Sequence, residues 1–308
     1  MPPPIHLNKT FTHTSPTHTT TLHHTTLGSP SLPPLILIHG TPWSSLTYHS
    51  LALSLSTHFH THLFDNPGFG TSPLSTPLPS FSPTTPIEAH DSDLARQSAV
   101  YAALFKEWES DPSHGWNGRK PHIVAHDHGG LMALRALLLH DCAYASLCLI
   151  DVVALGPFGQ PLFKSVAENP DAFINLPDLA FDGILESYIR NAAFKPLEPG
   201  LLGELMEPWQ REGGKEGFVR QLCQANYRST EEVEGRYGEV GEKIPVKILW
   251  GREDRWIGVE TAERLGKALG AREVVILEEA GHLAMYDQPA RVGVELGTWL
   301  VRVEAGLV

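Results

Sequence analysis

Short apolar runs that alternate with helical stretches are the feature that most constrains the fold of this chain. Residues 35–38 read Leu-Ile-Leu-Ile and lead into His39, as expected of a strand buried on both faces. Similar runs recur at residues 62–65, 122–125, 146–150, 246–250 and 273–277. Helical spacing predicts helices near residues 46–56, 91–109, 131–140, 260–269 and 289–303. This alternation predicts an α/β fold with a mainly parallel, doubly wound sheet.

Two segments depart from the alternation. Threonine and histidine alternate over residues 12–26, which favours a two-stranded ribbon at the edge of the sheet. Residues 155–241 contain repeated prolines, have helical character and include no convincing strand. A long helical insertion between strands is typical of a cap over an active site. We therefore expect an α/β core at residues 1–155 and 242–308, with a helical cap at residues 156–241.

Charge and polarity exclude two classes of partner. The chain has 35 acidic and 23 basic residues, a net charge of −12, whereas nucleic acids and anionic membranes attract basic surfaces. Its most apolar stretch, residues 131–155, contains four polar groups that disfavour a membrane span: Arg135, His140, Asp141 and Asp151. We expect neither nucleic acid nor a membrane as a partner.

The start of the chain, its cysteines and its histidines bear on location and metal binding. The start lacks the basic and apolar regions of a secretory signal, and the three cysteines show no C-x-x-C spacing. Buried free thiols suit a reducing compartment, so we expect a cytoplasmic protein. Several of the 17 histidines lie near the start without partners at ligand spacing: His6, His13, His18, His23 and His24. The sequence therefore predicts no metal site.

The segment Ala125-His126-Asp127-His128-Gly129-Gly130 lies between a predicted strand and a predicted helix. A sharp strand–turn–helix presents a nucleophile at its tip and requires small residues two positions to either side, here Ala125 and Gly129. The usual pattern is G-x-S-x-G, so this sequence has alanine for the first glycine and Asp127 for serine. The alternative is an ordinary turn in which Asp127 caps the helix.

Two later residues favour the nucleophile. Asp254 lies just past the strand at 246–250, and His282 lies just past the strand at 273–277. The carboxyl ends of parallel strands meet at one edge of a sheet, so Asp127, Asp254 and His282 are expected to converge there. We predict that they form a triad of nucleophile, acid and base.

The loop His39-Gly40-Thr41-Pro42 follows the first buried strand. Gly40 allows this loop to turn in beneath the nucleophile. The backbone N–H groups of Thr41 and His128 are then the natural pair to hold an oxyanion.

Together these motifs resemble the α/β-hydrolase superfamily, over residues 30–155 and 242–305. The motifs are His39-Gly40-Thr41-Pro42, Asp65-Asn66-Pro67-Gly68-Phe69-Gly70-Thr71-Ser72, Ala125-His126-Asp127-His128-Gly129-Gly130, Gly251-Arg252-Glu253-Asp254-Arg255 and Gly281-His282. The aspartate at the elbow is similar to that of epoxide hydrolases, haloalkane dehalogenases and fluoroacetate dehalogenases. In such enzymes the carboxylate attacks a saturated carbon, and water activated by the histidine hydrolyses the resulting ester without a cofactor. Fluoroacetate dehalogenases and some haloalkane dehalogenases have the acid at a different position, and Asp151 resembles that alternative acid here.

The substrate class rests on a few further residues. Epoxide hydrolases resemble one another in two cap tyrosines; Tyr227, in Asn226-Tyr227-Arg228, looks like the second, and Tyr188 is a candidate for the first. Trp43 and His39 are further candidates for the pocket. Haloalkane dehalogenases usually carry Trp after the nucleophile and Asn or Glu in the HG-x-P loop, where this chain has His128 and Thr41.

These residues favour a hydrolase that opens an epoxide, with a small, largely apolar molecule and water as its partners. Dehalogenation with the same triad is the alternative. Hydrolysis of an ester, a lactone or a carbon–carbon bond comes third. A non-catalytic ligand-binding member of the superfamily is the hypothesis from another class.

Overall fold

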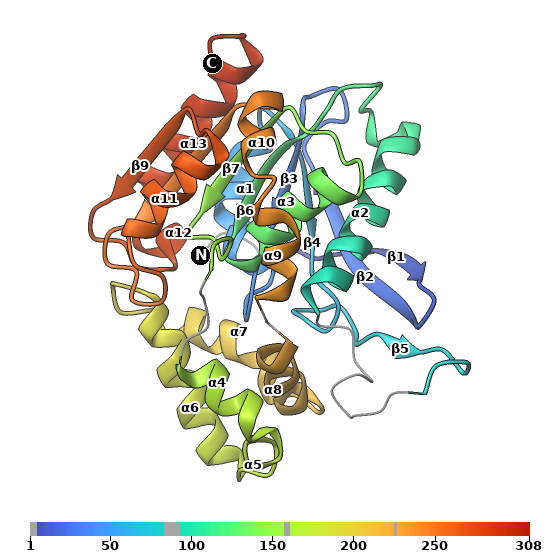
Figure 1. The fold of residues 1–308 in the computed structure, drawn as a ribbon, viewed down its shortest axis with the longest axis vertical. Coiled ribbons are helices and arrows are strands. Elements are labelled where there is room, and N and C mark those ends of the chain that lie inside the picture. Colours follow the sequence, from blue (N-terminus) through green and yellow to red (C-terminus); the bar gives the residue numbers. More distant parts are fainter. Residues whose placement is uncertain (1–4, 83–92, 157–160, 225–226) are drawn as a thin grey trace.

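The computed structural model describes residues 5–82, 93–156, 161–224 and 227–308. A nine-stranded sheet runs through the molecule in the order β1-β2-β4-β3-β6-β7-β8-β9, and β5 pairs with β2 (Figure 1). Six strands are parallel to one another: β3 (Pro34–Ile38), β4 (His60–Phe64), β6 (His122–His126), β7 (Ser146–Ile150), β8 (Val246–Gly251) and β9 (Glu273–Leu277). The predicted α/β fold with a mainly parallel sheet is therefore confirmed.

An antiparallel ribbon forms one edge of the sheet. Strands β1 (Lys9–Thr14) and β2 (His18–Leu27) pair with Phe11 opposite Leu22, and β2 continues the sheet by pairing with β4. The short strand β5 (Thr76–Pro77) adds to β2. The ribbon predicted from the threonine–histidine alternation is confirmed.

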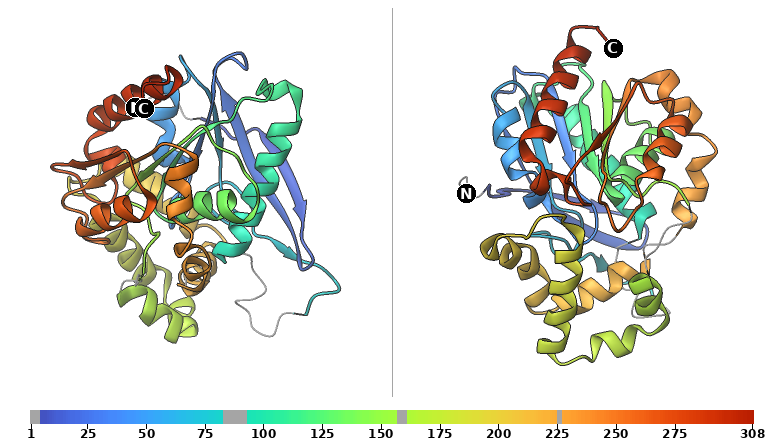
Figure 2. Two further views of the ribbon diagram at one scale, coloured as in Figure 1. Left: turned by 45° about the horizontal axis from the view of Figure 1, so that its top comes forward. Right: turned by 90° about the vertical axis from the view of Figure 1, so that its left-hand side faces the viewer.

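Helices cover both faces because alternate residues of each strand point to opposite sides. Ile36 and Ile38 of β3 pack with α2 (Leu94–Ser110), α3 (His128–Leu139) and α11 (Glu260–Leu269). Leu35 and Leu37 pack on the other face with α1 (His49–Leu55) and α13 (Pro289–Glu304). Short helical turns η1 (Ser45–Tyr48), η2 (Pro112–His114) and α12 (Ala284–Asp287) join these elements. Figure 2 shows the sheet between the two helical layers.

A separate helical lobe stands over the carboxyl ends of the parallel strands (Figures 1 and 2). It consists of α4 (Pro161–Glu168), α5 (Pro170–Ile174), α6 (Asp178–Ala192), α7 (Pro199–Gln210) and α8 (Gly214–Gln224). Its helices bury a hydrophobic cluster of their own, in which Leu185 and Trp209 meet Trp43 and Leu283 of the core.

The lobe ends earlier than the sequence predicts. Helices α9 (Arg228–Glu234) and α10 (Gly238–Lys243) lie within the expected cap, yet they pack on the core helices α3 and α11. Val233, Tyr237 and Val240 are buried in the same cluster as the sheet, and the Tyr237 hydroxyl donates to the Ala154 carbonyl at 2.7 Å. The difference arises because helical composition does not reveal which neighbour a helix covers.

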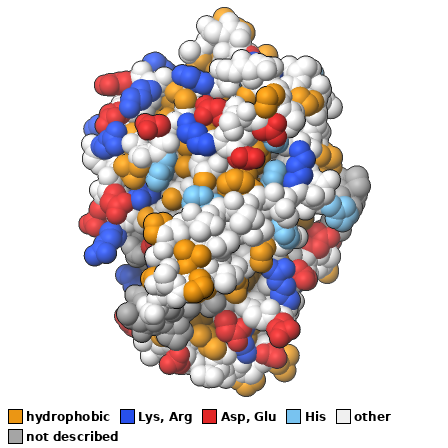
Figure 3. All heavy atoms as spheres, turned by 90° about the vertical axis from the view of Figure 1, so that its right-hand side faces the viewer, with side chains coloured by type: hydrophobic (Ala, Val, Ile, Leu, Met, Phe, Trp, Pro, Cys, Tyr) orange, Lys and Arg blue, Asp and Glu red, His pale blue; other side chains and the backbone are white. Residues whose placement is uncertain are grey.

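Acidic and basic side chains are interspersed on the face that carries the β1–β2 ribbon (Figure 3). This face therefore presents no continuous surface of one charge. Among the residues that the structure describes, none of the helices is both long and apolar enough to span a membrane.

Candidate active site

Asp127 occupies the tip of a sharp turn between β6 and α3. Its backbone lies at φ 53° and ψ −129°, outside the regions that most residues adopt. A Cβ on Gly129 would stand 2.5 Å from the Ile38 carbonyl oxygen, so this turn requires glycine there. The Asp127 side chain makes no capping bond to α3, which excludes the interpretation of Asp127 as a simple helix cap.

The two carboxylate oxygens of Asp127 have different neighbours. Oδ1 accepts a hydrogen bond from the Thr41 N–H at 2.6 Å, and Oδ2 lies 3.2 Å from Nε2 of His282. The backbone nitrogen of His128 would be 2.7 Å from a Cβ on Gly40, so it borders the same small space. One oxygen thus lies in the predicted oxyanion hole while the other faces the histidine.

Replacing Gly40 by alanine is expected to abolish most activity. The added Cβ would stand 2.2 Å from Asp127 Oδ1 and 2.7 Å from the His128 nitrogen, so the carboxylate must leave the hole. Loss of one such donor costs roughly 10²–10³ in kcat, and we expect a loss at least that large. Gly183→Ala is the matched control, because a Cβ at Gly183 meets nothing within 4 Å. A Gly40→Ala enzyme with normal kcat would contradict this arrangement.

His282 is held by hydrogen bonds at both ring nitrogens and at its backbone. Nδ1 lies 2.9 Å from Oδ2 of Asp254, and the His126 Nε2 contacts the His282 carbonyl at 2.8 Å. Oδ1 of Asp254 accepts from the backbone N–H groups of Trp256 and Ile257 at 2.7 and 3.0 Å. These bonds fix the carboxylate that orients the imidazole.

Asp151, the alternative acid, does not contact His282. Its Oδ1 accepts from the Gly251 N–H at 2.7 Å, and its Oδ2 is buried with no hydrogen-bond partner among the described residues. Burial, together with the charge of Asp254, raises the pKa of Asp151 well above its usual range. The hydrogen bond to Gly251 joins the end of β7 to β8, and the raised pKa makes Asp151 less suited than Asp254 to balance the charge of a protonated histidine.

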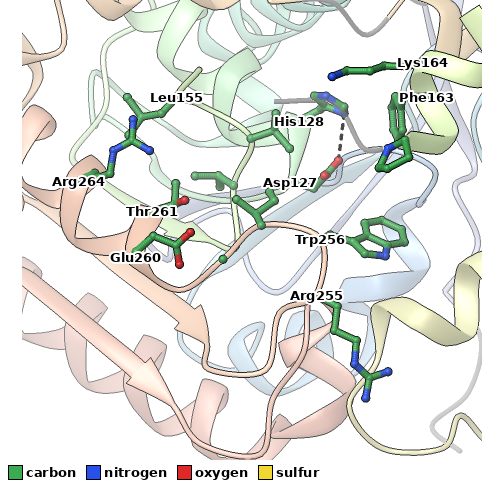
Figure 4. A pocket seen from close by; sticks show the side chains of 15 residues that line it. Asp127, His128, Leu155, Phe163, Lys164, Arg255, Trp256, Glu260, Thr261 and Arg264 are labelled. Carbon is green, nitrogen blue, oxygen red and sulfur yellow. Dashed lines mark ion pairs between the residues drawn. The ribbon is translucent and has the colours of Figure 1, made fainter. Parts of the chain in front are cut away.

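The charges in the triad depend on one another. Burial lowers the pKa of His282, but the charges of Asp254 and Asp127 and their hydrogen bonds outweigh it and raise this pKa to about 10. Burial raises the pKa of Asp127, but His128 and His282 together hold it well below its usual range. Nδ1 of His128 lies 3.2 Å from Asp127 Oδ1, as Figure 4 shows. These shifts favour an ionised Asp127 beside a protonated His282.

Asp287 joins the histidine loop to the helical lobe, a role that no sequence motif indicated. Its carboxylate accepts three backbone N–H groups at 2.8 Å, from Gly281, Phe194 and Lys195. Gly281 precedes His282, while Phe194 and Lys195 follow α6. Asp287 thus links the segment after α6 to the loop that carries His282.

A cavity of about 570 Å³ opens beside Asp127 and His128. Its apolar wall includes Val152, Phe163 and Trp256, and charged side chains also line it: Lys164, Arg255, Glu260 and Arg264. Figure 4 shows Asp127 near Trp256, with Glu260 and Arg264 at some distance along the cavity. The walls are more polar than the largely apolar substrate of the sequence prediction requires. Arg255 lies in the loop after β8, Glu260 and Arg264 lie in α11, and Lys164 lies in α4.

Tyr188 and Trp43 lie close to this cavity. The Tyr188 ring stacks on Trp256 at 4.3 Å and approaches Phe163 at 6.4 Å, and Trp43 stacks on Trp256 at 5.6 Å. The Tyr188 hydroxyl and the Trp43 Nε1 are buried and lack hydrogen-bond partners among the described residues. Burial and the charge of Asp127 raise the pKa of Tyr188 well above its ordinary value.

Tyr227 and His39 do not lie where the predicted role in substrate binding would require. The Tyr227 hydroxyl donates to Glu234 at 2.5 Å, and Tyr227 is not among the residues that line the cavity; its neighbour Asn226 lies outside the described residues. His39 accepts from the Asn66 N–H at Nε2, so its Nδ1 carries hydrogen and donates to the Gly40 carbonyl. His39 therefore holds the loop in place instead of facing a substrate.

The chain matches a model of the alpha/beta hydrolase family over residues 35–293, more than half its length. It belongs to the alpha/beta hydrolase family. This hydrolase is 45% identical over 265 residues to a pimeloyl-[acyl-carrier protein] methyl ester esterase of Aeromonas salmonicida, covering 83% of this chain and 91% of the esterase. An alpha/beta hydrolase fold protein from Burkholderia ambifaria is 32% identical, with a TM-score of 0.81 over 95% of this chain and 97% of that one.

Solved structures of other named activities share the fold of this hydrolase. The haloalkane dehalogenase DbeA of Bradyrhizobium elkani superposes with a TM-score of 0.70 over 97% of this chain and 99% of the dehalogenase. The two sequences are only 15% identical, so this likeness is one of fold alone.

Proposed function

We propose that this α/β hydrolase opens an epoxide with water through a covalent ester on Asp127. The observation that carries the proposal is the position of the Asp127 carboxylate, with Oδ1 bound by the Thr41 N–H and Oδ2 beside His282. A carboxylate held in this way is ionised and oriented for attack on a saturated carbon. Its Cγ is also placed for a later attack by water, since the oxyanion would form on Oδ1.

In the first step Oδ2 attacks a ring carbon of the epoxide, and the bond between that carbon and the ring oxygen breaks. The ring oxygen takes a proton from the Tyr188 hydroxyl, because an alkoxide is a much stronger base than a tyrosinate. Esterification removes the charge of Asp127, one of the two carboxylates that raise the pKa of His282. His282 then gives up its proton more readily, and this proton restores Tyr188.

In the second step neutral His282 takes a proton from water, and the resulting hydroxide attacks Cγ of the ester. The negative charge develops on Oδ1, where the N–H groups of Thr41 and His128 stabilise it. Collapse breaks the bond between Cγ and Oδ2, and Oδ2 takes the proton from His282 and leaves with the product. The diol leaves, and the new carboxyl group returns its proton to the histidine. Asp127 now contains one oxygen from water.

Tyr188 is the reason to place epoxides first. Epoxide opening requires a proton donor for the ring oxygen, and the buried Tyr188 hydroxyl has no hydrogen-bond partner among the described residues. Tyr188 stacks on Trp256 at 4.3 Å, and Trp256 in turn lies 4.7 Å from the His282 ring, so the tyrosine belongs to the surroundings of the Asp127–His282 pair. Tyr227, the other candidate donor, already donates its hydroxyl hydrogen to Glu234.

A Tyr188→Phe variant is expected to open epoxides roughly 10²-fold more slowly, the effect typical of losing one general acid. The reason is that the alkoxide would then leave without its donor. Tyr227→Phe is the matched control and is expected to keep its turnover, because its hydroxyl bonds to Glu234. The measurement is diol formation from a panel of epoxides under saturating conditions. Equal rates for the wild type and Tyr188→Phe would remove the preference for epoxides.

Two alternatives have specific support. Dehalogenation is supported by the Trp43 Nε1 hydrogen, a buried donor with no partner among the described residues, which could donate a hydrogen bond to the departing halide.

Ester hydrolysis is supported by the methyl ester esterase that is 45% identical to this chain. An ester would have to give a mixed anhydride with Asp127, a less favourable intermediate than an alkyl ester. Halide release and methanol release by the wild type separate these activities from diol formation.

A further inference from the structure

Three buried histidines converge at the edge of the sheet opposite the active site. His60 and His62 come from β4, and His114 comes from η2. One ring nitrogen of each lies within 4.8 Å of the other two. All three side chains are buried, with residue exposures of 2%, 0% and 5%. This cluster plays no part in the reaction proposed above.

Hydrogen bonds to the backbone orient two of these rings. Nδ1 of His60 lies 3.0 Å from the His114 carbonyl, and Nδ1 of His62 lies 3.1 Å from the His60 carbonyl. A carbonyl accepts only, so each Nδ1 carries the hydrogen and each Nε2 carries a lone pair. For His62 this assignment is supported independently, because the Trp116 indole N–H donates to its Nε2 at 3.3 Å. Hydrogen bonds to the main chain therefore orient the Nε2 lone pairs of His60 and His62.

The same pattern is typical of histidines that bind metals. A ligating histidine almost always donates its second ring N–H to a backbone carbonyl or a carboxylate, which fixes the tautomer. His60 and His62 each have such a carbonyl, and Nε2 of His114 lies 3.8 Å from Oδ2 of Asp111. Asp111 is partly exposed, so its carboxylate can become the fourth ligand of the metal. Otherwise a water molecule can occupy the fourth coordination position.

We propose that His60, His62 and His114 bind a divalent transition metal, with Zn²⁺ as the representative ion. Neutral imidazoles suit Zn²⁺, Ni²⁺ and Cu²⁺ far better than Mg²⁺ or Ca²⁺, which prefer oxygen ligands. Zn–N distances of about 2.0–2.1 Å bring tetrahedral ligands to roughly 3.4 Å from one another. The ring nitrogens, which lie within 4.8 Å of one another, must therefore approach by as much as about 1.4 Å. Nε2 of His62 must also give up its hydrogen bond from Trp116 to bind the metal.

The place of the cluster indicates a structural metal. His60 is the first residue of β4, at the amino end of the parallel strands, whereas Asp127 lies beyond the carboxyl end of β6. A five-residue strand separates these edges by about 16 Å. The ion would join the start of β4 to η2, which precedes β6 in the chain, and so would stabilise the sheet without touching the substrate.

Zinc titration of the chelator-treated protein tests this assignment. The wild type is expected to bind one Zn²⁺ by calorimetry and to unfold about 5 °C higher at a hundredfold excess over Kd. His114→Gln is expected to weaken this binding at least tenfold; it is the mildest change, since no backbone bond to the His114 ring is present among the described residues. His58→Gln, an exposed histidine two residues before His60, is the matched control and should bind as the wild type does.

Two further variants distinguish the histidine cluster from the triad and from a misfolded protein. His282→Gln removes the triad as a zinc site and is expected to leave the titration unchanged. Trp116→Phe deletes the N–H that competes for His62 Nε2, so zinc affinity should rise about fivefold, the equivalent of one neutral hydrogen bond. A misfolded protein would not bind more tightly.

Zinc binding that survives His114→Gln, or that disappears in His282→Gln, overturns the site, as does a wild type that binds no zinc. Unchanged or weaker binding by Trp116→Phe overturns the assignment of His62 Nε2 as a ligand. Failure of any of these leaves the proposed epoxide chemistry untouched, because they are measured without substrate.

Discussion

A His282→Gln enzyme given an epoxide is expected to accumulate a covalent adduct on Asp127. Glutamine cannot take a proton from water, so the first step proceeds while hydrolysis of the ester slows by at least about 10³-fold. The surrounding bonds that orient Asp127, above all the one from the Thr41 N–H, remain in place. Intact-mass spectrometry should find the protein heavier by the mass of the epoxide, and peptide mapping should place that mass on Asp127.

The same experiment separates the possible substrate classes. An epoxide adds its whole mass, a haloalkane adds only its alkyl group, and an ester adds an acyl group. His140→Gln, which alters a partly exposed histidine at the end of α3, is the control and should show no adduct. Single turnover of the wild type in oxygen-18 water should also label the Asp127 carboxyl. A carboxyl that never gains the label would refute the covalent mechanism, although the fold would stand.

Substitution of the two buried acids is expected to separate their roles by orders of magnitude. Asp254→Asn should lower kcat by roughly 10³–10⁴, because the amide no longer fixes the histidine tautomer or balances its charge. Asp151→Asn should lower kcat less than about tenfold, because burial raises the pKa of Asp151 and so favours its neutral form, which an amide resembles. Both asparagines retain an oxygen that can accept the existing backbone N–H bonds.

Steady-state kinetics of both variants, together with their thermal unfolding midpoints, provide the measurement. Similar midpoints would show that a loss of rate is not a loss of structure. If Asp151→Asn proved the slower enzyme, the acid of the triad would have to be reassigned to the end of β7. The hydrogen bond between Asp254 and His282 would then be structural only.

Much of the fold was predictable because its signals are local. Each buried strand is a short apolar run, and β7, β9 and α11 begin and end where the apolar and helical patterns indicate. The edge ribbon follows from alternating β-branched residues. The cap boundary was not predictable, since α9 and α10 have the composition of cap helices and bury Val233 and Val240 against the core instead.

The sequence alone determined the sheet and brought Asp127, Asp254 and His282 to one edge of it. It could do so because the carboxyl ends of parallel strands lie at the same edge of a sheet. The loops that follow those strands therefore meet there. Only the tertiary structure decided that Asp254 and not Asp151 hydrogen-bonds to the histidine, and that Tyr227 bonds to Glu234. It also decided that His114 meets the neighbouring pair His60 and His62. These outcomes depend on where side chains point after a turn and on which surfaces pack together, and neither leaves a periodic signal along the chain.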